Sequence, residues 1–314
     1  ILEYERKPST SSEFWNVWGY YLDDKRNRFK PRSLSKFLSL RKHLEAFENH
    51  CKIPWQFKTL TKSYLEKFQN YCYEEGLLNT QTTSKYIGNL KSFLNWAVEN
   101  GHSDNLSFKG FRSIIQKESL KVALSIDEID AIRDCTIPED KRYLFNVRQL
   151  FLLSILTGLR YSDYSRVKAE HLKVHDRIPF LQISQMKTGD IIEIPLTPEA
   201  KKIVEHLIEG MVHPISNQKM NSYVKELCQL SGINEPFEVY QQKGAMRFST
   251  TRPKFELITT HTGRRTFATN LLLKGLPAQT VMQFTGHKDY KSFSKYVNIP
   301  KSTEMELVTK ALLG

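Results

Sequence analysis

The sequence is poor in cysteine, and its few cysteines are far apart. Four occur among 314 residues, at Cys51, Cys72, Cys135 and Cys228. They form neither a Cys-x-x-Cys pair nor a cysteine and histidine spacing of the kind that binds zinc, so the sequence predicts no metal site. Reduced and buried thiols are expected instead.

The sequence also lacks a long hydrophobic run. Its longest apolar stretch, FLLSILTGL at residues 151–159, is far shorter than the roughly 20 residues that a membrane span needs. The chain starts at Ile1 without a charged segment followed by an apolar one, so the sequence shows no secretory signal. We therefore expect a cytoplasmic protein without a membrane partner, and we expect this chain to be part of a longer protein.

Acidic residues are outnumbered by basic ones. The 34 Asp and Glu residues face 46 Lys and Arg residues, which gives a net charge of +12. This excess favours a polyanionic partner such as nucleic acid, although ribosomal and membrane-surface proteins share it. With 40% hydrophobic and 25% charged residues, the composition is typical of a globular protein, and the length suits two domains.

Apolar residues recur at helical spacing in four segments of the first hundred residues. The segments are Phe14–Leu22, Leu34–Phe47, Tyr64–Cys72 and Tyr86–Val98. Such stripes usually pack in a core, so they predict a small helical bundle whose function belongs to its outward basic residues. The candidates for DNA binding there are Lys25, Arg26, Arg28, Lys30, Arg32, Lys85 and Lys91.

A segment rich in Gly, Ser and Lys separates this bundle from the rest of the chain. It predicts a linker at 106–122, between a helical domain at 1–105 and a second domain at 123–314. In the second domain, Ser125 and Glu128 form a capping-box pattern that starts a helix. The stretch RIPFLQISQMKTGDIIEIPLT predicts two short strands joined by KTGD, and the remaining patterns are helical. We therefore predict a mainly α fold, with one small β-sheet in a mixed α/β second domain.

Two polar positions of the second domain lie where a rigid element would present them. Arg160 follows Gly158, which ends an apolar helix, and Asp163 is a candidate partner three residues later. Lys187 lies at the tip of the predicted hairpin. Taken singly, a salt bridge at a helix end and a solubilising surface lysine are the simpler explanations.

Histidine, arginine and tyrosine follow nearer the C-terminus. The stretch HTGRR places His261 at a helix start, with Arg264 one turn along on the same face. The stretch TGHKDYKSFSKYV sets Gly286 and His287 at a helix entry, with Tyr296 nine residues after the histidine. Taken singly, a helix cap, a core histidine and a buried tyrosine are again the simpler explanations.

Together, these residues fit one reaction, the transfer of a phosphoryl group in DNA. Arg160 and Arg264 supply bidentate donors for the nonbridging oxygens of the transition state. Tyr296 is then the nucleophile, and a phosphotyrosine ester conserves the bond energy, so the step is reversible without ATP. Lys187 suits protonation of the leaving 5′ oxygen, and His261 suits a base or a hydrogen-bonding partner. Neither a metal, a cofactor nor a small-molecule substrate is expected.

The same stretches resemble the motifs of the tyrosine recombinases, the lambda-integrase-like family of site-specific DNA strand transferases. TGLRYSD resembles the family's first arginine box, which implies that Arg160 is catalytic and that Asp163 supports it. HTGRRTFAT resembles the His-x-x-Arg box, which implies catalytic roles for His261 and Arg264. Arg265 stands where the family often has histidine, and it joins the candidates for DNA binding.

TGHKDYKSFSKYV resembles the last box of that family. The match implies that His287 occupies the His/Trp position and that Tyr296 is the nucleophile. Tyr290 lies too close to His287 for the nucleophile's spacing. Lys187 matches the family's hairpin lysine.

The resemblance covers both parts of the chain. It implies a SAM-like core-binding domain and a catalytic domain that clamp double-stranded DNA, and a homotetramer on two DNA sites with accessory DNA-bending proteins. It also implies association with the nucleoid when DNA is bound. TGLRYSDYSRVKAEHL is most similar to integrases of Bacteroides-type mobile elements, which often carry a further N-terminal arm-binding domain.

The tail STEMELVTKALLG, at 302–314, has apolar residues at helical spacing in Met305, Val308 and Leu312. They predict a short amphipathic helix, which packs either on its own domain or, as the resemblance implies, on a neighbouring protomer. Two other functions remain open for the whole chain. A type IB topoisomerase uses tyrosine in the same way but acts as a monomer, and a non-catalytic DNA-binding protein would lack one of the box residues.

Overall fold

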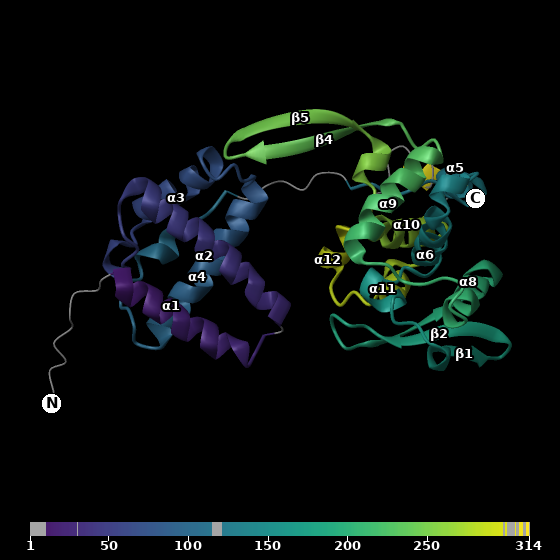
Figure 1. Ribbon diagram of the computed structural model, residues 1–314, viewed down its shortest axis with the longest axis horizontal. Helices are drawn as coiled ribbons and strands as arrows, with labels where there is room; N and C mark the ends of the chain where they lie inside the picture. Colours follow the sequence, from purple (N-terminus) through teal and green to yellow (C-terminus); the bar gives the residue numbers. More distant parts are fainter. Residues whose placement is uncertain are drawn as a thin grey trace. The chain divides into compact units, whose positions relative to one another are not determined.

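The computed structural model describes residues 11–29, 31–114 and 121–297, together with Ile299, Met305, Val308, Thr309, Leu312 and Leu313. The chain divides into two compact units, Ile1–Ser119 with Tyr240–Thr250 and Leu120–Val239 with Thr251–Gly314. We call them the N-terminal unit and the C-terminal unit. Both are mainly helical, as predicted (Figure 1).

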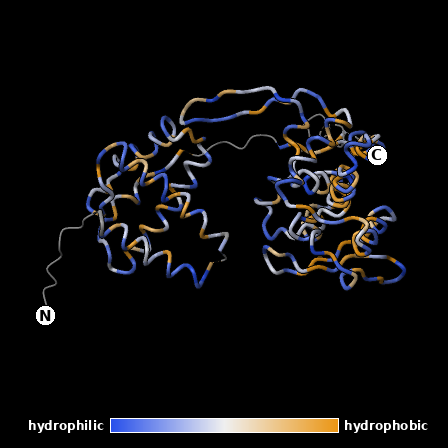
Figure 2. The backbone as a smooth tube through the Cα atoms, in the orientation of Figure 1, coloured by the Kyte–Doolittle hydropathy of each residue, from blue (hydrophilic) through white to orange (hydrophobic). Residues whose placement is uncertain are grey.

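Helices form the N-terminal unit where the apolar stripes predicted them. They are α1 (Ser11–Arg26), α2 (Pro31–Cys51), α3 (Lys62–Glu74) and α4 (Thr80–Glu99), with the 3-10 turns η1 (Phe57–Thr59) and η2 (Ser107–Gly110). Their buried faces make an aromatic core, in which the rings of Trp18 and Phe93 approach to 4.7 Å. Along most of the helices of both units, hydrophobic and hydrophilic residues alternate, which is the pattern of amphipathic elements (Figure 2).

The predicted linker at 106–122 lies partly outside the described residues. Its first residues are ordered, because Phe108 and Phe111 are buried in the core of the N-terminal unit. At its other end, Val122 is buried in the core of the C-terminal unit. Buried aromatic and aliphatic residues thus anchor both ends of the segment, whose Gly, Ser and Lys content predicts a linker.

The C-terminal unit is built around one apolar helix. Its helices are α5 (Ile126–Asp134), α6 (Tyr143–Thr157), α7 (Tyr161–Tyr164), α8 (Pro198–Ile208), α9 (Asn217–Leu230), α10 (Thr260–Leu273), α11 (Ala278–Thr285) and α12 (Tyr290–Ser294). The predicted capping box at Ser125 and Glu128 is present at the start of α5. Helix α6 is apolar on nearly every side and packs against α8, α9 and α10, so it is the centre of this core.

A three-stranded antiparallel sheet lies beside these helices, in the order β1 (Leu172–His175), β2 (Ile178–Ser184) and β3 (Ile191–Pro195). The β2–β3 hairpin is the one that the sequence predicted, and Ser184 pairs with Ile191 at its end. Strand β1 was not predicted. Its turn to β2 uses Asp176 and Arg177 at positive φ, without the glycine that usually marks such a turn in a sequence.

A second hairpin corrects the prediction of a single small sheet. It consists of β4 (Pro236–Lys243) and β5 (Met246–Pro253) and turns at Gly244, whose φ is +61°. Its tip, Tyr240–Thr250, belongs to the N-terminal unit. There the buried hydroxyl of Thr80 donates to the carbonyl of Gln242 at 2.8 Å and accepts from the amide of Gly244 at 3.0 Å. Strand β5 is exposed at seven of its eight positions and has no apolar alternation. In β4, the partly buried Phe237 and Val239 alternate with exposed residues, a short signal that the prediction missed.

The predicted tail helix at 302–314 falls largely outside the described residues. Of those described, Met305, Val308 and Leu312 have helical backbone and exposed side chains. In the part of the chain that the structure describes, every helix is too short or too polar to cross a lipid bilayer.

Candidate active site

The end of α6 positions Arg160. Gly158 ends the helix in the left-handed conformation, with a φ of +66°, and a Cβ atom there would lie 2.4 Å from the ring of Phe267. A larger residue would therefore be strained and would push α10 away. The chain turns sharply at this glycine, and Arg160 becomes the residue that precedes α7. Its side chain is mostly buried, and Nη1 donates to Oε1 of Gln185 at 2.9 Å.

Arg264 reaches the same place from α10. A Cβ atom on its neighbour Gly263 would lie 2.7 Å from the hydroxyl of Ser154, so the glycine lets α10 approach α6 closely. The guanidinium of Arg264 is fully buried (0% exposed), donates from Nη1 to the carbonyl of Gly158 at 2.7 Å, and donates from Nη2 to the carbonyl of Thr285. Burial and the nearby charge of Arg160 lower the pKa of Arg264 to about 9, so it remains cationic at neutral pH.

Tyr296 lies directly over this arginine. The centre of its ring is 5.9 Å from Cζ of Arg264, 4.7 Å from the ring of His287 and 5.9 Å from the ring of His261. The structure thus brings together four of the residues that the sequence singled out. It also shows that the tyrosine ring and two carbonyl groups cover Arg264, whereas the sequence predicted a guanidinium open to a phosphate.

Both histidines of this group are held in the neutral form. Removal from water is the main cause that lowers the pKa of His261 to about 4, although part of its surface remains exposed, and Arg265 and Arg264 add to the effect. The pKa of His287 is also lowered to about 4, first by burial and then by Arg264 and Arg160. Its Nδ1 lies 2.7 Å from the hydroxyl of Thr285. Its buried Nε2 has no hydrogen-bond partner among the described residues.

The sequence predicted His287 at a helix entry, and this was wrong. The residue lies in the turn after α11. Gly286 ends that helix with a φ of +60°, and α12 begins only at Tyr290, with Asp289 accepting from the amide of Ser292 at 2.7 Å. The misplacement has a simple physical cause. The sequence pattern predicts Gly286 at the start of the next helix, whereas its left-handed backbone closes the preceding one.

Lys187 lies in the turn between β2 and β3, as predicted, with an exposed side chain. Asp163 braces this turn, because its buried Oδ1 accepts from the amide of Met186 at 2.9 Å. Its Oδ2 is 3.9 Å from Nη1 of Arg160, which is an ion pair without a hydrogen bond. Asp163 therefore contacts the lysine turn more closely than the arginine to which the sequence assigned it.

Two residues of this arrangement were missed by the sequence analysis, Gln185 and Thr285. Gln185 is buried and follows Leu181 and Ile183 at every second position along the inward face of β2. A glutamine in line with core aliphatics was the signal that could have identified it. Thr285 contributes mainly its backbone carbonyl, for which a sequence carries no signal.

The predicted DNA contacts of the N-terminal unit differ in how accessible they are. Lys25, Arg26 and Arg28 form ion pairs with Asp24 or Asp23. Lys91 is engaged within the unit, because its ammonium group donates to the carbonyls of Lys109 and Phe111. Lys85 is exposed. Lys30 and the side chain of Arg32 lie outside what the structure describes.

In the C-terminal unit, the remaining DNA-binding candidate is Arg265, which is partly buried and whose pKa is lowered by burial. Within the described residues, no three His, Cys, Asp or Glu side chains gather in a group that would hold a metal ion.

The fold and this group of side chains define a tyrosine recombinase. Residues 122–302 match the model of the phage integrase family, and residues 13–114 match that of the phage integrase SAM-like domain. The chain belongs to the phage integrase family, and its activity is that of a tyrosine-type site-specific DNA recombinase.

Individual proteins agree with this assignment. Tyrosine recombinase XerD of Listeria innocua serovar 6a is 25% identical over 246 residues, which cover 77% of this chain and 80% of the relative. A tyrosine recombinase of Pseudothermotoga lettingae is 22% identical over 262 residues, which cover 82% and 84%.

Solved structures share the fold. A lambda integrase dimer bound to a COC′ core site superimposes with a TM-score of 0.67 at 19% identity, over 92% of this chain and 95% of that one. The Tn1549 transposon integrase in complex with a circular intermediate DNA gives 0.68 at 15% identity, over 94% and 99%.

Proposed function

We propose that Tyr296 is the nucleophile with which this recombinase cleaves and rejoins DNA strands, through a 3′-phosphotyrosine intermediate. The observation that carries the proposal is the position of the Tyr296 ring, which lies within 5.9 Å of His261, His287 and the Arg264 guanidinium. A phenol surrounded by arginine and neutral histidine is well placed both to lose a proton and to meet an anionic phosphate.

In the proposed step, the phenol oxygen of Tyr296 forms a bond to phosphorus while the bond from phosphorus to the 5′ oxygen breaks. The phenol proton passes to a histidine or to water, and Lys187 donates a proton to the leaving 5′ oxygen. Arg160 and Arg264 stabilise the negative charge on the nonbridging oxygens. The reverse of this step, with another 5′ hydroxyl, rejoins the strand, so neither ATP nor a metal ion is consumed.

The Tyr296 ring covers the Arg264 guanidinium, so the proposal includes a movement of the Tyr296 side chain. The tyrosine ring occupies the space over the guanidinium, so a phosphate reaches Arg264 only after the Tyr296 side chain swings aside. Tyr296 follows α12, which has only five residues and ends at Ser294, so a change in this short segment suffices. Binding of DNA would supply the free energy for the change.

The proposed partner is double-stranded DNA, and the proposed assembly is a homotetramer on two DNA sites. The net charge of +12 suits a polyanion, and a lambda integrase of the same fold, with a TM-score of 0.64, is a tetramer bound to a Holliday junction. Accessory DNA-bending proteins are further proposed partners. We place the protein in the cytoplasm, at the nucleoid when it is bound to DNA.

A nicked suicide substrate tests the proposal. Duplexes from the ends of the element that encodes the protein would carry a nick close to the cleavage position, so that a short strand diffuses away and traps the adduct. We expect a covalent protein–DNA band with the wild type and none with Tyr296→Phe. Cleavage without a covalent band, or an unchanged band in the variant, contradicts the proposal. Strand exchange between two duplexes, as opposed to relaxation of supercoils alone, separates recombination from topoisomerase activity.

A further inference from the structure

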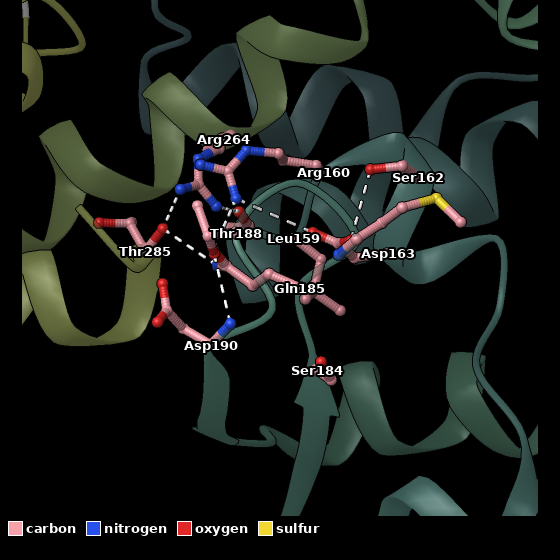
Figure 3. Close-up of polar contacts among 12 residues, drawn as sticks. Leu159, Arg160, Ser162, Asp163, Ser184, Gln185, Thr188, Asp190, Arg264 and Thr285 are labelled. Atoms are coloured by element: carbon pink, nitrogen blue, oxygen red, sulfur yellow. Dashed lines mark hydrogen bonds and ion pairs between the residues drawn. The ribbon is translucent and has the colours of Figure 1, made fainter. Parts of the chain in front are cut away.

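The principal partner of Arg160 is a neutral amide. Nη1 of Arg160 donates to Oε1 of Gln185 at 2.9 Å, whereas the nearer carboxylate, Asp163, is 3.9 Å away (Figure 3). Gln185 is only 1% exposed and directly follows the end of β2. A buried polar side chain of this kind is fixed by its hydrogen bonds, because leaving them unmade in the interior is costly.

The amide of Gln185 joins three parts of the site. Its Nε2 donates to the carbonyl of Thr285 at 3.3 Å, and that carbonyl also accepts from Nη2 of Arg264. Its Oε1 accepts a second hydrogen bond, from the hydroxyl of Thr188 at 3.2 Å. One continuous chain of contacts therefore runs from Arg160 through Gln185 and Thr285 to Arg264, with a branch to the residue after Lys187 (Figure 3).

The surrounding backbone is shaped to hold this side chain. A Cβ atom on Gly286 would come within 2.5 Å of the Gln185 amide, so the glycine before His287 leaves the room that the side chain needs. The main chain of Gln185 also closes the lysine turn. Its amide donates to the carbonyl of Asp190, and its carbonyl accepts from the amide of Gly189, each at 2.8 Å.

The chemistry of the site explains why a glutamine suits this position. A carboxylate would hold the guanidinium firmly but would neutralise the charge that a phosphate needs. It also cannot donate to the carbonyl of Thr285. An amide accepts from Arg160 with one atom and donates to Thr285 with the other, and it leaves the positive charge of the arginine available.

We propose that Gln185 is a positioning residue of the recombination reaction. It fixes Arg160, the Lys187 turn and the Thr285–His287 segment in one arrangement. The inference rests on the proposed function above, because it concerns the rate at which Tyr296 forms the covalent adduct.

Gln185→Met tests the proposal, because methionine keeps the length and volume and removes the hydrogen bonds. The control is Gln182→Met on the same strand, where an exposed glutamine donates to Glu193. We expect adduct formation in a single turnover with saturating protein to be slowed about 10- to 100-fold by Gln185→Met, because a hydrogen bond to a charged group is lost. DNA affinity should stay close to the wild-type value. The midpoint of thermal unfolding should fall, because Arg160 and the carbonyl of Thr285 each lose a buried partner, so the rates are compared well below the midpoint of both proteins. Gln182→Met should react at the wild-type rate.

A double-mutant cycle separates positioning from packing. With Arg160→Lys in place, the guanidinium that Gln185 holds is absent, so we expect Gln185→Met to slow the reaction by less than about threefold further. A wild-type rate in Gln185→Met, or an equal loss in both backgrounds, overturns the inference.

If Gln185→Met does not fold, Gln185→Glu takes its place. It keeps the shape and adds a charge, so adduct formation should slow at least as much, and a wild-type rate would again overturn the inference. Absence of an adduct with the wild type is a different result, because it contradicts the proposed function and not the role of Gln185 alone.

Discussion

The rings of His287 and Tyr296 lie 4.7 Å apart, centroid to centroid. In the chain, His287 precedes helix α12 and Tyr296 follows it. The helix is anchored by Phe293, which is buried against Ala268 and Val281 and whose ring is 5.5 Å from that of His287. Two side chains that are nine positions apart in the sequence are therefore neighbours in the structure. Val297, the residue after the tyrosine, is partly buried against the same small cluster, so apolar contacts on both sides of Tyr296 in the chain hold this segment at the site.

The first prediction concerns the nucleophile. Tyr296→Phe keeps the ring and deletes only the oxygen, so it should abolish the covalent adduct and leave DNA binding unchanged. Tyr290→Phe is the matched control, since Tyr290 is 65% exposed and lies just six residues earlier. Gel analysis of a nicked substrate measures both. An adduct that persists in Tyr296→Phe and disappears in Tyr290→Phe would move the nucleophile to Tyr290.

The second prediction concerns the arginines. Arg160→Lys or Arg264→Lys should slow adduct formation by about 10²-fold or more, because a point charge does not reproduce a planar, bidentate donor. Arg264→Lys also loses a hydrogen bond within the site, because Arg264 donates to two different carbonyls from its two terminal nitrogens and a lysine does not reproduce that geometry. Arg142→Lys, at an exposed ion pair with Glu139, is the control and should react normally. A rate near that of the wild type would reduce the replaced arginine to a scaffolding role.

The third prediction concerns the lysine turn. If Lys187 protonates the leaving oxygen, Lys187→Ala should cleave ordinary DNA slowly and should recover most of its rate on DNA with sulfur at the 5′ position. Sulfur leaves as a thiolate without needing a proton. Cleavage rates on the two substrates provide the measurement. An equal defect on both excludes Lys187 as the acid.

The fourth prediction follows from the two neutral histidines. Their pKa values in the folded protein, about 4, lie below the ordinary value of 6.5, so the folded state binds fewer protons than the unfolded one. The associated stability is present above pH 6.5 and is lost as the pH falls toward 4. Urea unfolding at pH 7 and pH 5 should therefore show a smaller pH-dependent loss in His287→Gln than in the wild type. An unchanged pH dependence in His287→Gln would show that His287 is not the group that titrates.

The sequence predicted part of the local geometry around the candidate site residues, because that geometry depends on short motifs. Two of these predictions depend only on neighbouring residues, and the structure confirms both. Arg160 follows a glycine that ends a helix, and His261 and Arg264 lie one turn apart on α10. The cover over Arg264 could not be predicted, because it depends on where α10, α11 and α12 meet. Lys91 was similarly placed on an outward face, yet two carbonyls from a distant part of the chain bind its ammonium group.

The same limit explains the missed hairpin of β4 and β5. Strand β5 is almost wholly exposed and lacks the period of two that marks a half-buried strand, and β4 shows that period only in the short run of Phe237 and Val239. Its tip is held by Thr80, which lies 162 residues before Gln242 in the chain. A contact over such a separation leaves no local pattern.

The last prediction tests that contact. Thr80→Val keeps the shape of the side chain and removes the hydroxyl that accepts from the amide of Gly244 and donates to the carbonyl of Gln242. The Gly244 amide then loses its partner in a partly buried position, so local opening of the hairpin tip should become easier. Hydrogen exchange of the peptide at 240–250 should speed up by up to about tenfold, because an unpaired group costs about 1–3 kcal/mol when it is fully buried and less when it is partly buried, as here. Thr83→Val is the control, since Thr83 is also buried on α4 but its hydroxyl donates to the carbonyl of Asn79, the residue that caps the start of the same helix. Equal exchange rates in the two variants would mean that the hydroxyl of Thr80 does not hold the tip.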